Sequence, residues 1–132
     1  MSPFSISKTT KTYPTQWPYE TIKNDVLGKR YSLSLLFTGP TRAQKLNVQY
    51  RKKTYAPNVL SFPLDATTGE IVICPTIANP EARQYNLSKP GYIAFLFIHG
   101  LLHLKGHDHH TETEAVAMER LEQKYVRKYG IS

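Results

Sequence analysis

All five histidines of this chain lie between residues 99 and 110. His99 and His103 are four residues apart, so on a helix they lie one turn apart on the same face. Gly106 follows, and glycine readily takes the left-handed conformation that ends a helix. Past such a stop the chain can fold back and return His109 toward the first two imidazoles. The spacing therefore predicts a metal site with His99, His103 and His109 as ligands.

Three protein ligands leave one position of a tetrahedral ion open to water or substrate, which is typical of a catalytic site. An ion held in this way is a Lewis acid that can lower the pKa of water to about 7. Three imidazoles suit one zinc ion best, although nickel, copper or another divalent ion could bind. The alternative is a histidine-rich surface turn beside a core helix. The position of Gly106 between the second and third ligands favours the metal site.

The polar neighbours of His109 leave two questions open. His107 and His110 flank it and could replace it as a ligand or be solvated. Asp108 is a candidate catalytic residue, because an outer-sphere carboxylate can accept a proton from a ligand imidazole or from water at the ion. It could equally be a polar turn residue.

The residue after the first histidine argues against a peptidase. Zinc peptidases of the metzincin type read His-Glu-x-x-His-x-x-Gly-x-x-His, with the glutamate as general base. This chain has the same histidine and glycine spacing, but Gly100 occupies the position of that glutamate. Glycine costs about 1 kcal/mol relative to alanine inside a helix. We therefore expect a neighbouring element or a substrate to approach the backbone closely at Gly100.

The composition predicts one globular domain over residues 1–132, with 40% hydrophobic and 20% charged residues. The one cysteine, Cys74, excludes an internal disulfide and suits a reducing compartment. It lies in an apolar run and is predicted to be a core residue rather than a nucleophile. Residues 1–11 do not resemble a secretory signal, and the apolar stretch 92–104 is too short to span a bilayer. We expect a cytoplasmic protein without membrane association.

The net charge of +7 is unevenly distributed along the chain. Residues 1–64 hold ten Lys and Arg against two Asp and Glu, whereas residues 65–132 hold seven against eight. A basic surface is expected of a protein that meets phosphate backbones. Arg51, Lys52 and Lys53 form a basic cluster that is a candidate substrate-binding group. The alternative is a solvated helix end whose charge complements the helix dipole.

Hydrophobic periodicity predicts the secondary structure. Strands are expected at residues 4–7, 31–37, 59–63 and 71–74, with a turn at 67–70 and the last two strands antiparallel. Helices are expected over residues 14–28, from a Thr41 cap to residue 49, from a Ser88 cap to residue 105, and from a Thr111 cap to Gly130. Residues 75–89 are expected to be irregular, with a helical turn near 81–85. The helix ending at residue 105 is apolar on nearly every side, which predicts a central position.

The histidine motif and an upstream block together resemble the YbeY family, bacterial rRNA maturation factors regarded as metal-dependent endoribonucleases. The upstream block comprises residues 46–51 and 59–63, and the resemblance extends over about residues 31–126. Residues 69–74 and the spacing of Glu114, Met118 and Glu122 also fit. Two spaced motifs are more specific than either alone. Two departures are Asn58, where the family usually has aspartate, and His107, where it usually has tyrosine.

The resemblance implies an α/β (α+β) fold: a small mixed four-stranded sheet packed by helices, with a central metal-bearing helix. It implies that His99, His103 and His109 carry the metal and that Arg51 is functional. The implied activity is cleavage of single-stranded ribosomal RNA, in maturation of the 3′ end of the small-subunit rRNA and in ribosome quality control. Ribosomal RNA and the small subunit or its proteins are the implied partners, with no nucleotide cofactor. Rival hypotheses are a metal-dependent hydrolase of another substrate and a non-catalytic ribosome-assembly factor whose metal holds the fold.

Overall fold

Four strands form a mixed sheet in the order β1-β2-β4-β3. The computed structural model describes residues 3–10 and 12–132. β1 pairs with β2 and β2 with β4 in parallel, whereas β3 and β4 are antiparallel, as predicted for the last two strands. The elements in chain order are β1 (Phe4–Lys8), α1 (Tyr19–Leu27), β2 (Ser32–Phe37), α2 (Pro40–Arg51), β3 (Val59–Asp65), β4 (Thr68–Ile73), α3 (Pro75–Ala78), the 3-10 helix η1 (Asn79–Tyr85), α4 (Lys89–Lys105) and α5 (Glu112–Lys128).

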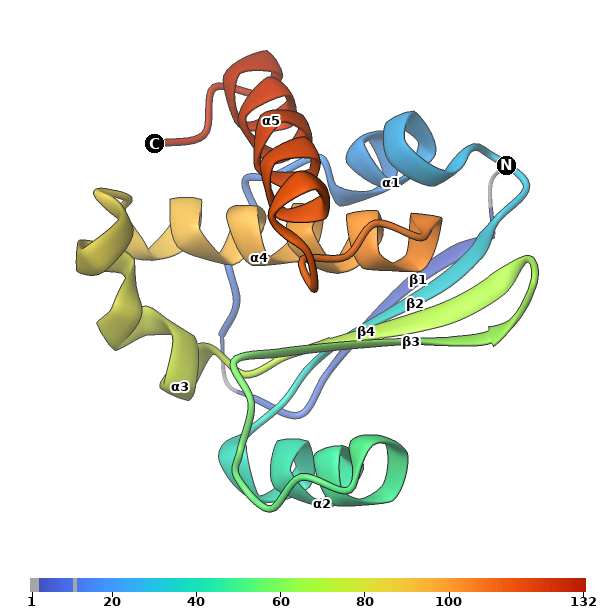
Figure 1. The fold of residues 1–132 in the computed structure, drawn as a ribbon. Coiled ribbons are helices and arrows are strands. Elements are labelled where there is room, and N and C mark those ends of the chain that lie inside the picture. The colour runs from blue at the N-terminus through green and yellow to red at the C-terminus, as the bar shows by residue number, and fades with distance from the viewer. Residues whose placement is uncertain (1–2, 11) are drawn as a thin grey trace.

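Helix α4 lies in the middle of the molecule (Figure 1). One side of it faces the sheet, α1 and α5 lie beyond it, and α2 covers the opposite face of the sheet. This position explains why α4 is apolar on nearly every side, since a helix enclosed by its neighbours needs no polar face. The predicted fold class and the central position of this helix are both confirmed. The buried residues of α4 are Gly91, Tyr92, Ile93, Ala94, Leu96, Phe97, Ile98, Gly100, Leu101 and Leu102.

The sheet separates two apolar clusters of different size. The main core lies between the sheet and helices α1, α4 and α5, and includes Leu35, Ile71 and Phe97, which are fully buried. A smaller cluster of Leu60, Phe62 and Val72 lies on the other face, where the partly buried Leu46 of α2 packs against it. The α2 side of the sheet therefore buries little apolar surface. Most of α2 is left to solvent.

Proline and glycine set the ends of two helices differently from the prediction. Helix α1 begins at Tyr19 rather than at residue 14, because Pro18 is its cap and a residue before proline disfavours helical dihedrals. Helix α2 begins at Pro40, with Gly39 and not Thr41 as its cap. Proline is well suited to that first position, since its missing N–H would have no partner there. Helix α2 also continues past residue 49 to Arg51.

The β3–β4 hairpin and the segment after it are more regular than the sequence predicted. The turn is shifted toward Asp65, whose carboxylate accepts the backbone N–H of Thr67 at 2.8 Å. The predicted turn residues 68–70 instead pair with both neighbouring strands and belong to β4. Residues 75–85 form α3 and η1 rather than an irregular segment with one helical turn. Cys74 is buried, as predicted for a core residue.

Within the described part of the chain, no helix combines the length and the apolar character needed to cross a bilayer.

Candidate metal centre

Helix α4 fixes the spacing of the first two histidines. It begins as predicted, because the side-chain oxygen of Ser88 accepts the backbone N–H of Gly91 at 3.0 Å and Pro90 lies in the first turn. His99 and His103 lie one turn apart in the second half of the helix. Their Nε2 atoms are 3.1 Å apart. The helix therefore presents two imidazole nitrogens to one point in space.

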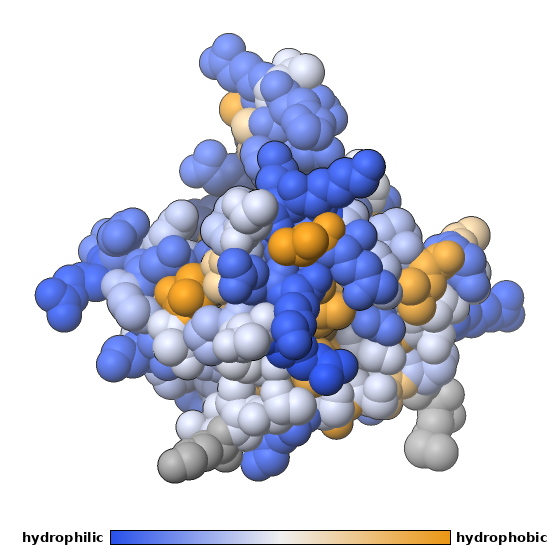
Figure 2. All heavy atoms as spheres, turned by 90° about the horizontal axis from the view of Figure 1, so that it is seen from below, coloured by the Kyte–Doolittle hydropathy of each residue, from blue (hydrophilic) through white to orange (hydrophobic). Residues whose placement is uncertain are grey.

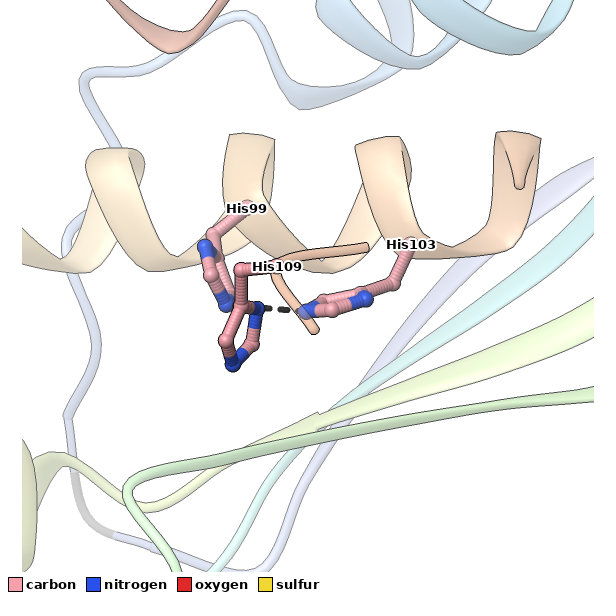
Figure 3. A group of neighbouring side chains, drawn as sticks. All are labelled: His99, His103 and His109. Atoms are coloured by element: carbon pink, nitrogen blue, oxygen red, sulfur yellow. Dashed lines mark hydrogen bonds between the residues drawn. The ribbon is translucent and has the colours of Figure 1, made fainter. Parts of the chain in front are cut away.

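Gly106 turns the chain back toward these two rings. Its φ is +110°, in the left-handed region. Its N–H donates to the carbonyl of His103, and the N–H of His107 donates to the carbonyl of Leu102, each at 3.0 Å. These are the two hydrogen bonds of a Schellman motif, which ends a helix at glycine. The returning segment places His109 beside the other two histidines (Figure 3).

We expect Gly106→Ala to lower the free energy of unfolding by about 1–2 kcal/mol, because an L-residue is strained at this φ. A Cβ at this position would meet no atom within 4 Å, so the cost comes from the backbone and not from a clash. Metal affinity should fall as well, since the turn positions His109. Chemical denaturation and a competitive metal titration measure the two effects. Lys105→Ala is the control, and equal stability of the two variants would contradict the role of this turn.

The three imidazoles offer one nitrogen each, and these three atoms lie within 4.8 Å of one another. A tetrahedral zinc ion with bonds near 2.1 Å would hold its nitrogen ligands about 3.4 Å apart. The three histidines therefore need only small side-chain adjustments to surround an ion, and a set of three neutral nitrogens is a donor set that zinc accepts. The residues present fit a metal ion.

A buried carboxylate lies behind the first histidine. Glu122 of α5 is buried, and its Oε2 is 2.6 Å from Nδ1 of His99. A carboxylate at this nitrogen favours the tautomer whose proton is on Nδ1, which leaves Nε2 free to bind a metal. Sequence reasoning placed Glu122 in a family pattern but gave it no role in the site. The available signal was an acidic residue on the apolar side of a helix, between the buried Met118 and Tyr125.

We expect Glu122→Gln to weaken metal binding about 10- to 100-fold, the usual effect of losing an outer-sphere partner. Glutamine retains the size of the side chain but removes the negative charge that holds the His99 ring. Competition with a chelator of known affinity measures the change. Glu119→Gln, one turn earlier on the same helix and exposed, is the matched control. Equal metal affinity in the two variants would show that Glu122 is a structural residue only.

The environment of His103 also favours the form that binds metal. Burial lowers the pKa of His103, and the neighbouring His99 lowers it further. A lowered pKa means that the neutral imidazole is favoured over the charged form, and only the neutral imidazole binds a metal. His103 is therefore ready to bind an ion without first losing a proton at neutral pH.

Asp108 and the flanking histidines lie at the edge of this group. The Asp108 carboxylate accepts the backbone N–H of His109 at 2.8 Å, and this bond is the main reason that the pKa of Asp108 is lowered. Its other oxygen is 3.0 Å from Nε2 of His110, whose side chain is 80% exposed. In the described chain the group that could hold a metal contains His99, His103 and His109, and neither His107 nor His110. Asp108 thus shapes the turn that carries His109, while a catalytic role for it stays a prediction.

A polar cavity of about 450 Å³ adjoins the histidines. Arg51, at the end of α2, reaches this cavity, whereas Lys52 and Lys53 are exposed and do not line it. Asn58 and Ser61 were not predicted from the sequence to belong to the site. Asn58 is held there because its amide nitrogen donates to Glu81 at 2.9 Å. The residues that line the cavity are Arg51, Asn58, Val59, Ser61, His99, His103, Asp108, His109 and His110.

Gly100 lies where the sheet approaches α4 closely. A Cβ at this position would lie 3.1 Å from Cδ1 of Ile71 in β4. The expected close neighbour is therefore a strand of the protein itself. With a glutamate at position 100, the Ile71 side chain would have to give by a few tenths of an ångström, which is a steric reason that favours glycine.

Comparison with known proteins gives matches along almost the whole chain. A family profile described as "Endoribonuclease YbeY" matches residues 4–130. Two relatives named Endoribonuclease YbeY come from Polynucleobacter asymbioticus and Stenotrophomonas maltophilia. The first relative is 38% identical, and the match covers 76% of this chain and 67% of the relative. The second is 34% identical, and the match covers 89% of this chain and 78% of the relative. The solution structure of TM1509 from Thermotoga maritima is similar with a TM-score of 0.68 and 26% identity, covering 96% of this chain and 88% of that one.

Proposed function

Because this chain belongs to the YbeY endoribonuclease family, we propose that it is a metal-dependent endoribonuclease that cuts single-stranded ribosomal RNA. We assign it to maturation of the small-subunit rRNA 3′ end and to ribosome quality control in the cytoplasm, with the small subunit or its proteins as partners. The observation that carries the proposal is the polar cavity in which Arg51 and three converging imidazoles line the same space. Positive charge and metal ligands at one cavity suit a phosphodiester.

His99, His103 and His109 would hold the ion, for which zinc is the best fit to the donor set. Bound there, the ion would supply Lewis acidity to a phosphoryl oxygen and lower the pKa of a water molecule. Arg51 would bind phosphate oxygens in a bidentate contact, which a lysine cannot match. Asp108 has a lowered pKa and is ionised at neutral pH. It can therefore accept a proton in the cavity but not donate one.

The face of the molecule that carries α2 supports an approach route for RNA. Figure 2 shows this face as mostly hydrophilic, with only scattered apolar groups. Residues 40–53, which form α2 and its end, contain five Lys and Arg and no Asp or Glu. A one-signed surface of this kind attracts a phosphate backbone without reading its sequence. We propose that Lys52 and Lys53 guide RNA along this face toward Arg51.

Metal analysis of the purified protein together with a chelator-controlled digestion of ribosomal RNA tests the proposed function. Chelation should abolish cleavage, and added zinc should restore it. Binding of precursor rRNA by the metal-loaded protein without any cleavage would instead favour an assembly factor. Cleavage that persists in protein shown to be free of metal would exclude the proposed role of the histidines.

A further inference from the structure

A second cavity opens on the other side of the candidate metal centre. It has a volume of about 490 Å³ and shares His99 and His109 with the polar cavity that holds Arg51. Helices α4 and α5 and the end of η1 surround it, whereas the polar cavity lies toward α2 and β3. Two of the three predicted metal ligands, His99 and His109, thus form a common wall between two cavities of different character, while His103 lines the polar cavity alone.

A row of aromatic rings leads along this cavity to the metal centre. The ring centroid of Tyr85 lies 5.7 Å from that of Phe95, and the Phe95 centroid lies 6.4 Å from the His99 ring. Tyr85 also stacks on the buried Tyr92 at 5.0 Å, which fixes its position. Nevertheless Tyr85 is 52% exposed. An exposed ring held in place by its neighbours offers a flat group a stacking surface at little entropic cost.

Apart from the two histidines, the lining of this cavity offers no side chain that suits a phosphate group. None of its lining residues is a Lys or Arg, whereas Glu119, Glu122 and Gln123 lie on its α5 side. Glu122 is engaged with His99, so Glu119 and Gln123 remain as acceptors of hydrogen bonds. Leu87 and Met118 supply apolar surface. The cavity suits a flat, neutral group that has apolar faces and N–H donors at its edge, and its volume is within the range of about 300–1,000 Å³ usual for small-molecule sites.

We propose that this cavity is a nucleobase subsite, which receives the base of the nucleotide next to the phosphate bound at the metal centre. The base stacks on Tyr85 and Phe95, and its exocyclic amine donates to Glu119 or Gln123. Single-stranded RNA is commonly recognised by bases that stack on aromatic side chains and hydrogen-bond through their edges. The subsite rests on the proposed function, because the phosphate and sugar must lie on the Arg51 side of the histidines for the base to reach it.

The test compares ligands that share a phosphate but differ in the base. The zinc-loaded protein is titrated with adenosine 5′-monophosphate, adenosine 3′-monophosphate and ribose 5-phosphate, and binding is followed by NMR. At least one nucleotide should bind about tenfold more tightly than ribose 5-phosphate, the effect expected of one stacked base. Tyr85→Ala should reduce the affinity for that nucleotide to the level of ribose 5-phosphate. The affinity for ribose 5-phosphate itself should not change. Tyr85→Phe should retain the tight binding.

Tyr55→Ala is the matched control, because Tyr55 is 55% exposed and lines neither cavity. It should leave all three affinities unchanged. Equal affinity of the wild type for nucleotides and ribose 5-phosphate would overturn the proposal, as would an equal loss for every ligand in Tyr85→Ala. Base-dependent binding without rRNA cleavage would support the nucleobase subsite but contradict the proposed endoribonuclease activity. Cleavage without base-dependent binding would support the activity but contradict the subsite.

Discussion

Replacement of His103 by alanine is expected to abolish stable metal binding and to lower RNA cleavage about a thousandfold. Loss of one of three ligands leaves two imidazoles, which cannot hold the ion against water at ordinary metal concentrations. A bound ion would supply several kcal/mol of transition-state stabilisation, which corresponds to about three orders of magnitude in rate. His103 is the most informative ligand to remove, because it is more buried than His109 and does not contact Glu122.

Metal content by mass spectrometry and cleavage of ribosomal RNA measure the two effects in the same preparation. His107→Ala is the control, since His107 lies outside the group of three and its loss should leave the metal content unchanged. Circular dichroism shows whether both variants are folded. Full cleavage by folded, metal-free His103→Ala protein would mean that the nuclease is a contaminant or that the histidines have another purpose.

Replacement of Arg51 by alanine should lower the rate of cleavage about 100- to 1,000-fold with no change in metal content. This is the usual cost of losing one group that stabilises developing charge in a transition state. Arg51→Lys should restore only part of the rate, because an ammonium group cannot make the bidentate contact of a guanidinium. The separation of rate from metal content distinguishes Arg51 from the histidines.

The two neighbouring lysines are the controls for Arg51. Lys52→Ala and Lys53→Ala remove the same charge from the same helix end, but neither side chain lines the polar cavity. Each substitution should lower the affinity for RNA modestly, and the difference in affinity from the wild type should become smaller at high salt. The cleavage rate at saturating RNA should not change. Equal effects of all three alanine substitutions would show that Arg51 acts through general attraction and not at the reacting phosphate.

The parts of this site that depend on local spacing could be predicted from the sequence. The four-residue interval between His99 and His103 and the glycine three residues later determine where the rings lie, because one helix and one turn contain them all. The same holds for the Ser88 and Thr111 caps, whose side chains accept backbone N–H groups three residues ahead. Such contacts join residues that are close in the sequence, so they can be predicted without knowing how distant segments pack.

The parts that depend on packing between distant segments could not be predicted in this way. Glu122 reaches His99 only because α5 crosses α4, and the sequence does not give that crossing. Lys52 and Lys53 were grouped with Arg51 by sequence, but α2 ends at Arg51, and the left-handed conformation of Lys52 turns the chain away from the helix there. Tyr85 comes from a segment that was expected to be irregular apart from one helical turn, so its place beside Phe95 of α4 could not be predicted.

The position of α5 has a consequence for the order in which the candidate metal centre is completed during synthesis of the chain. The three histidines and Arg51 precede this helix in the chain, so they leave the ribosome first. Until α5 has emerged and packed, His99 has no carboxylate behind it, and the cavity lined by Tyr85 and Phe95 lacks the wall that α5 supplies. We therefore expect the three histidines to acquire their full affinity for a metal ion only after α5 has packed against α4.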